Sequence, residues 1–89
     1  MKLDILTPEK TLFSGDVDSV TLPGMLGLFT VLPDHAPMIS SLRPDGEVTY
    51  AQEGENKRLA IGGGFVEVRN NHITVCAEPG ATASEKNES

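Results

Sequence analysis

Hydrophobic and polar residues alternate with a period of two along most of the chain, and the roughly 3.6-residue period of an amphipathic helix is almost absent. In the stretch KLDIL, Leu3 and Ile5 fall on one side. In residues 17–22, Val20 and Leu22 share one side, and hydroxyl side chains lie on the other. Because successive side chains of a strand point to opposite faces, these stretches predict short β-strands.

The clearest alternation is FVEVRNNHITVCA at residues 65–77. Two alternating runs flank Asn70 and Asn71, and asparagine tolerates the positive φ that a two-residue hairpin turn requires. This stretch therefore predicts a β-hairpin. A second turn signal, RPDG at residues 43–46, precedes the alternating stretch EVTYA.

Short strands separated by turn signals every eight to twelve residues or so are typical of sandwiches and small barrels. We therefore predict an all-β fold, a small sandwich of two antiparallel sheets, each with one dry and one wet face. A chain of 89 residues fits one domain, which we place at residues 1–80. Residues 81–89, ATASEKNES, are expected to form a flexible polar tail.

Charge and apolar content exclude two classes of direct partner. A formal net charge of −6 argues against nucleic acid, which is bound by clustered Lys and Arg. The longest apolar stretch, LPGMLGLFTVLP, is broken by Gly and Pro and is far shorter than the ~20 residues of a spanning helix, so we expect no direct membrane insertion. The single cysteine, Cys76, favours a reducing compartment, and its alternating context predicts a small buried hydrophobe.

The residue types needed for nucleophilic catalysis occur near one another, namely Asp34, His35, Ser40 and Ser41. Proximity in sequence does not bring a nucleophile, a base and a carboxylate within hydrogen-bond reach, and so short a chain offers little material for a pocket. His72 and Cys76 are two potential ligands where a structural zinc site takes four. We therefore expect no catalytic residues, no metal and no cofactor.

A run of three glycines at residues 62–64 precedes an alternating stretch that predicts a strand. A phosphate-binding loop would be followed by Lys-Ser or Lys-Thr and a helix. The glycines are therefore expected to permit a bulge or a close crossing of two backbones.

Two loops have unusual composition. VLPDHAP at residues 31–37 holds His35 between two prolines, which predicts a stiff, extended loop. PGMLGLF at residues 23–29 places Met25, Leu26 and Leu28 where polar residues are usual. These side chains either fold inward at the start of a strand or form an exposed contact patch, and the sequence leaves both open.

The order of these motifs resembles the N-terminal domain of the epsilon subunit of F-type ATP synthases, from about Leu3 to Glu78. The matching segments are LDILTPEKTLFSGDVDSVTLPG, FTVLPDHAP, SSLRPDG and GGGFVEVRNNHITVCAE. The LPxHAP loop together with the GGFxEV segment makes the resemblance specific. It implies a β-sandwich of about ten short strands, without catalytic activity or cofactor.

The resemblance also implies a role as a rotor subunit of the central stalk. Such a subunit links the gamma subunit to the ring of c subunits and helps couple proton flow to ATP synthesis, as a peripheral protein at the cytoplasmic face of the bacterial inner membrane. The loop expected to contact the c-ring is Gly24, Met25, Leu26, Gly27 and Leu28. The positions expected to face the gamma subunit are Thr7, His35 and Ser40.

The chain departs from the family pattern in two respects. The ring-facing loop of the family is usually polar with acidic residues, whereas here it reads GMLGL, which suggests a drier contact with the ring. The chain also stops where typical members continue into a pair of inhibitory C-terminal helices, so we expect a short form without that switch. Two alternatives from other classes are a free-standing binding module that uses the GMLGL and PDHAP loops, and, more remotely, a small hydrolase.

Overall fold

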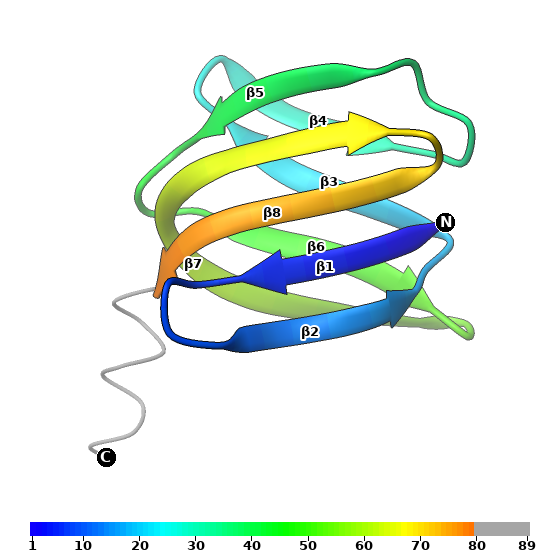
Figure 1. Cartoon of the computed structure of the whole chain (residues 1–89), viewed down its shortest axis with the longest axis horizontal. Helices are drawn as coiled ribbons and strands as arrows, with labels where there is room; N and C mark the ends of the chain where they lie inside the picture. Colours follow the sequence, from blue (N-terminus) through cyan, green and yellow to red (C-terminus); the bar gives the residue numbers. More distant parts are fainter. Residues whose placement is uncertain (80–89) are drawn as a thin grey trace.

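The computed structural model describes residues 1–79, and in this part of the chain every regular element is a strand (Figure 1). The eight strands are β1 (Lys2–Leu6), β2 (Thr11–Asp16), β3 (Ser19–Gly24), β4 (Gly27–Val31), β5 (Met38–Leu42), β6 (Glu47–Gln52), β7 (Glu55–Arg69) and β8 (His72–Pro79). The predicted all-β class is confirmed. The expected tail, residues 81–89, lies outside the described residues.

The strands form two layers that share β7. The five-strand layer has the order β2-β1-β8-β7-β5, and the four-strand layer has the order β4-β3-β6-β7. Residues 55–60 of β7 pair with β6, whereas residues 64–69 pair with β5 and β8. The predicted sandwich is therefore confirmed, with one long strand crossing from layer to layer.

The three glycines produce this crossing. The pairing of β7 with β8 shifts register between Ile61 and Gly64, and both Gly63 (φ +102°) and Gly64 (φ +136°) have backbone angles that side chains disfavour. A Cβ atom at Gly64 would also clash with the backbone of Cys76. The predicted bulge and close backbone approach are confirmed, and together they bend β7 around the core.

Two details of the predicted sandwich need correction. The described residues hold eight strands rather than about ten, in part because β7 is one continuous strand that serves both layers. The sheets are also not purely antiparallel, because β1 pairs with β8 in parallel, from Lys2 beside His72 to Leu6 beside Cys76. The alternating pattern specifies which face of a strand is buried. It does not specify which strand lies beside it, or whether the two strands run parallel or antiparallel.

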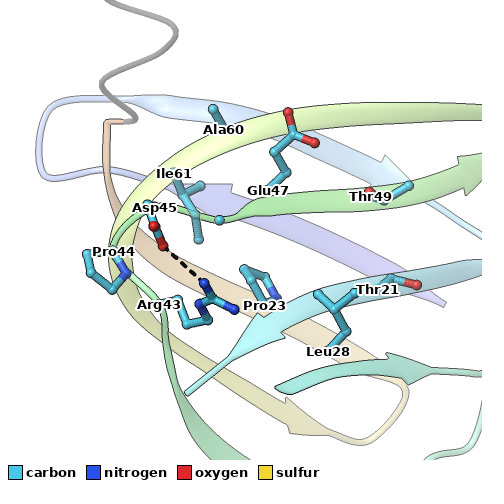
Figure 2. A pocket seen from close by; sticks show the side chains of 11 residues that line it. Thr21, Pro23, Leu28, Arg43, Pro44, Asp45, Glu47, Thr49, Ala60 and Ile61 are labelled. Atoms are coloured by element: carbon cyan, nitrogen blue, oxygen red, sulfur yellow. Dashed lines mark ion pairs between the residues drawn. The ribbon is translucent and has the colours of Figure 1, made fainter. Parts of the chain in front are cut away.

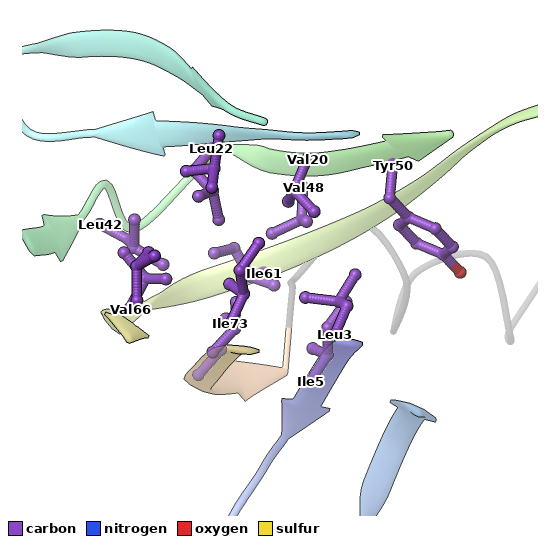
Figure 3. Packing of buried hydrophobic residues seen from close by; sticks show 14 of the residues in the cluster. Leu3, Ile5, Val20, Leu22, Leu42, Val48, Tyr50, Ile61, Val66 and Ile73 are labelled. Carbon is purple, nitrogen blue, oxygen red and sulfur yellow. The ribbon is translucent and has the colours of Figure 1, made fainter. Parts of the chain in front are cut away.

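The core lies between the two layers, as Figure 3 shows for Val20 and Leu22 of the four-strand layer and Val66 and Ile73 of the five-strand layer. The buried hydrophobic residues are Leu3, Ile5, Val17, Val20, Leu22, Val31, Leu42, Val48, Tyr50, Ile61, Val66, Val68, Ile73, Val75 and Ala77. Almost all of them are aliphatic. In the clearest alternating stretches, such as those of Leu3, Ile5, Val66 and Val68, they come from the positions that the period-two pattern assigns to the dry face. Val17 is an exception, because it is buried although the pattern places it on the side opposite Val20 and Leu22.

The predicted hairpin at residues 65–77 is confirmed. Asn70 (φ +53°) and Asn71 (φ +62°) form the two-residue turn between β7 and β8. Asn71 also holds two other segments, because its backbone oxygen accepts from Lys2 N at 3.1 Å and its Oδ1 accepts from Asp34 N at 2.9 Å. One turn residue thus joins the hairpin, the N-terminus and the loop after β4.

Replacing Asn71 with alanine should lower the free energy of unfolding by about 1–3 kcal/mol, since alanine tolerates positive φ poorly and cannot accept from Asp34 N. Urea unfolding would measure the change. Asn71→Gly is the matched control, because it removes the same hydrogen bond without the φ penalty and should cost less. Equal losses for both variants would show that the hydrogen bond, rather than the backbone angle, dominates.

Candidate functional site: two interaction surfaces

The turn between β3 and β4 carries the residues expected to contact the c-ring. Leu26 at its tip is fully exposed, and Met25 and Leu28 are 57% and 72% exposed. Gly27 opens β4 with φ +138°, and Met25 N donates to Ser41 O at 3.2 Å, which ties the tip to β5. Of the two possibilities that the sequence left open, the structure has the exposed apolar patch.

A shallow groove of about 550 Å³ runs beside this tip, between the β3–β4 turn and β5. Its lining is Gly24, Met25, Leu26, Gly27, Leu28, Phe29, Met38, Ile39, Ser40 and Ser41. None of these side chains is charged. The chain as a whole has a formal net charge of −6, so this uncharged groove beside the apolar tip differs from the acidic composition of the rest of the chain.

A second hollow, of about 480 Å³, lies on the other side of Leu28 (Figure 2). It extends from Leu28 and Thr21 to the β5–β6 loop, where Arg43 Nη2 lies 3.6 Å from Asp45 Oδ1. Both partners of this ion pair are at least half exposed, so it contributes little stability. Leu28 thus borders both hollows, whereas Met25 and Leu26 line only the groove beside the tip.

The loop that holds His35 is a tight turn rather than the extended loop we predicted. His35 N donates to Leu32 O at 3.2 Å, and Asp34 has φ +67°, as in a type II turn with proline in the second position. His35 Nδ1 donates to Ala36 O at 2.8 Å, which fixes the ring. The imidazole is half-buried and is held in one orientation by its own loop.

The other two positions expected to face the gamma subunit are also engaged with backbone. Thr7 Oγ1 closes the β1–β2 turn by donating to Lys10 O at 3.1 Å and accepting from Lys10 N at 3.2 Å. Ser40, on β5, donates through Oγ to Ser41 O at 3.2 Å. Neither hydroxyl bonds to His35 in the described structure, so these contacts assemble no catalytic arrangement.

The structure does not gather these three residues into one cluster. The register of β1, β8, β7 and β5 places Thr7 at one end of the five-strand layer and His35 at the other, with Ser40 partway along β5. The β3–β4 tip lies at the same end as Thr7, since Gly24 pairs with Leu42 at the end of β5. Ser40 also pairs with the buried Val66, so its side chain lies on the core-facing side of β5 and the three positions define no single outer face.

Sequence reasoning missed a polar network on the outer face of the five-strand layer. Asp4 accepts from Ser14 Oγ at 2.6 Å and from His72 Nε2 at 2.8 Å, which links β1 to both neighbouring strands. The hydrogen bond from Ser14, then that from His72, lowers the pKa of Asp4 below 3.8. Asp4 and His72 are far apart in sequence, so only the parallel pairing of β1 with β8 could have revealed this contact.

Because the folded state lowers the pKa of Asp4, the carboxylate stabilises the fold above its unfolded pKa, and this contribution is lost as pH falls through the folded pKa. Asp4→Asn should therefore flatten the dependence of unfolding free energy on pH below about pH 4. The effect should be small, about 0–1 kcal/mol, because the pair is partly exposed. Urea unfolding at several acidic pH values would show it, and an unchanged slope in the variant would contradict it.

Cys76 differs from its prediction. It is half-exposed rather than buried, because it alternates with the buried Val75 and Ala77 and so faces outward from β8. His72 is exposed at the start of β8, as expected. Among residues 1–79, no group of three or more His, Cys, Asp or Glu side chains is placed to hold a metal ion.

Residues 1–83 match the family described as the β-sandwich domain of the ATP synthase delta/epsilon chain. The chain belongs to this family. Curated relatives agree, because it is 42% identical over 85 residues to the ATP synthase epsilon chain of Geobacter sulfurreducens and 45% identical over 78 residues to that of Maricaulis maris. These alignments cover 96% and 88% of this chain but only 61% and 58% of the relatives, so the chain spans about three-fifths of their length.

Solved structures support the fold of this epsilon-type domain. A chain in the mitochondrial ATP synthase of Euglena gracilis, described as OSCP/F1/c-ring, matches with a TM-score of 0.78 at 22% identity over 84% of this chain and 48% of its own. A chain in the central stalk/c-ring structure of Tetrahymena thermophila matches with a TM-score of 0.73 at 15% identity, covering 86% of this chain and 62% of its own. Within the described residues, no helix has the length and apolarity to cross a membrane.

Proposed function

We propose that this epsilon-type domain is a non-catalytic rotor element of an F-type ATP synthase, which links the gamma subunit to the c-ring and helps couple proton flow to ATP synthesis. The family and the curated relatives support membership of the complex. The bacterial origin of those relatives supports a peripheral position at the cytoplasmic face of the inner membrane. The domain reaches the membrane through its partners rather than by inserting.

The observation that carries this proposal is the exposed apolar turn at one end of the β-sandwich. Met25, Leu26 and Leu28 are exposed, and exposed apolar patches are typical of contact surfaces. We assign this turn, residues 24–28, to the c-ring. Because the turn bears no charge, the contact with the ring is dry and depends on apolar burial rather than on ion pairs.

Thr7, His35 and Ser40 are assigned to the gamma subunit. Each lies in a segment fixed by hydrogen bonds, and a preordered contact loses less conformational entropy on docking. A β-sandwich that contacts the gamma subunit at these positions and the c-ring at its tip is suited to transmitting torque. His35 acts here as a shaped contact and transfers no proton.

Binding of the chain to the gamma subunit from the same source tests this proposal. We expect the parent chain to bind, and His35→Ala to weaken binding by about fivefold or more, as truncation of a buried contact does. His35→Asn is the informative companion, since its amide can replace the hydrogen bond to Ala36 O without the outer edge of the ring. If the parent chain does not bind gamma, the rotor assignment is wrong; if both variants bind normally, His35 only shapes its own loop.

A further inference from the structure

Exposed apolar side chains gather on one side of the molecule. Of the six large hydrophobic residues that are exposed in the described part of the chain, four line the groove beside the β3–β4 turn, namely Met25, Leu26, Leu28 and Ile39. We call these four side chains and the groove that they line the tip surface. Leu26 projects fully into solvent directly beside a hollow of about 550 Å³, so the tip surface carries both a projection and a recess.

The distribution of charge makes the tip surface suitable for contact between two copies of this chain. None of the side chains that line the groove is charged, whereas the whole chain has a formal net charge of −6. Two ion pairs border the surface, Arg43 with Asp45 on one side and Glu67 with Arg69 on the other. Two copies can therefore meet at the tip and the groove without bringing like charges face to face, which an acidic composition disfavours elsewhere.

Two open sheet edges lie beside the same groove. In the described part of the chain, β4 pairs with β3 alone, and β5 pairs with β7 on one side but with β3 only through Leu42. Edge strands commonly resist pairing with another chain through charged residues, proline or a bulge. The sequences of β4 (GLFTV) and β5 (MISSL) contain no charged residue and no proline, so these edges lack that protection.

We propose that two copies of the free chain pair reversibly through the tip surface, with Leu26 of each copy in the groove of the other. A twofold interface must be self-complementary, and a projection beside a recess meets that requirement. Standard stable interfaces use about 20–30 residues on each side, whereas ten line this groove, so we expect a dissociation constant in the micromolar to millimolar range. The inference goes beyond the rotor assignment. If the turn also binds the c-ring, the pair must separate on assembly.

Sedimentation velocity of the purified 89-residue chain over a range of concentrations tests the proposal. We expect the parent chain to shift from monomer to dimer, and Leu26→Asp to weaken the pairing by at least about tenfold, because a carboxylate would be buried in an apolar groove. Leu32→Asp is the matched control. It adds the same charge at an exposed leucine beyond the other end of β4 and should leave the pairing unchanged. Leu26→Met, which keeps an apolar side chain, should retain most of it.

Backbone NMR of the parent chain at several concentrations locates the contact independently. Amide shifts that change with concentration should be confined to residues 24–29 and 38–41. A chain that stays monomeric up to about 1 mM would overturn the inference. Equal effects of Leu26→Asp and Leu32→Asp, shifts centred on Phe65 instead, or growth beyond the dimer would overturn it as well. Each of these outcomes leaves the rotor proposal standing, since that proposal is tested by binding to gamma.

Discussion

Gly64→Ala should lower the free energy of unfolding by at least about 3 kcal/mol, a large share of the stability of so small a domain. Two costs combine at this position. The backbone angle of φ +136° suits glycine alone, and the added Cβ would meet the Cys76 carbonyl and the backbone of Ala77. Relief would require the bulge to move, and with it the crossing of β7 between the layers.

Gly54→Ala is the matched control for that experiment. Gly54 also has a positive φ, +82°, but a Cβ atom added there would meet no other atom within 4 Å. We expect it to cost only about 1 kcal/mol. Thermal or urea unfolding would separate the two variants, and similar losses would show that the close approach of β7 and β8 does not determine stability.

The double variant Met25→Asp/Leu28→Asp should weaken assembly with the c-ring by at least about tenfold. Each side chain is more than half exposed in the free domain, and burying an apolar side chain of this size contributes up to about 1.5–3 kcal/mol. Two carboxylates in a dry contact would also be desolvated without partners. Retention of the chain on purified c-ring would measure the effect.

Leu32→Asp controls for the added negative charge. Leu32 is 56% exposed and follows β4 at the end opposite the tip, so the change should not affect ring binding. The fold should tolerate the substitutions of Met25, Leu28 and Leu32, because these side chains lie outside the core. If the double variant assembled with the c-ring as well as the parent chain does, the proposed apolar contact at the β3–β4 turn would be contradicted.

The period-two pattern predicted the buried faces well because a strand with one face in the core must carry apolar residues at every second position. Leu3, Ile5, Val66 and Val75 are buried where the alternation places them. The Asn70–Asn71 turn was equally readable, since few residues accept positive φ. Both features depend on residues that are close together in the sequence, so the sequence alone was sufficient to predict them.

Features that depend on neighbours distant in sequence could not be predicted. The parallel pairing of β1 with β8 and the contact of Asp4 with His72 follow from the topology. Cys76 faces outward because it is next to the inward-facing Val75 in β8. The alternating pattern already placed these two residues on opposite faces, but we expected Cys76 to be a buried residue. The exposure of Phe65 depends on which face of β7 meets the second layer.

Site-directed cross-linking in the assembled complex tests the central claim most directly. With Cys76→Ser as background, a single cysteine introduced by Leu26→Cys or His35→Cys would carry a short maleimide cross-linker. The rotor assignment predicts that Leu26→Cys links this chain to a c subunit and that His35→Cys links it to gamma. Exchange of the two products, or the absence of both in a complex that contains the chain, would contradict it.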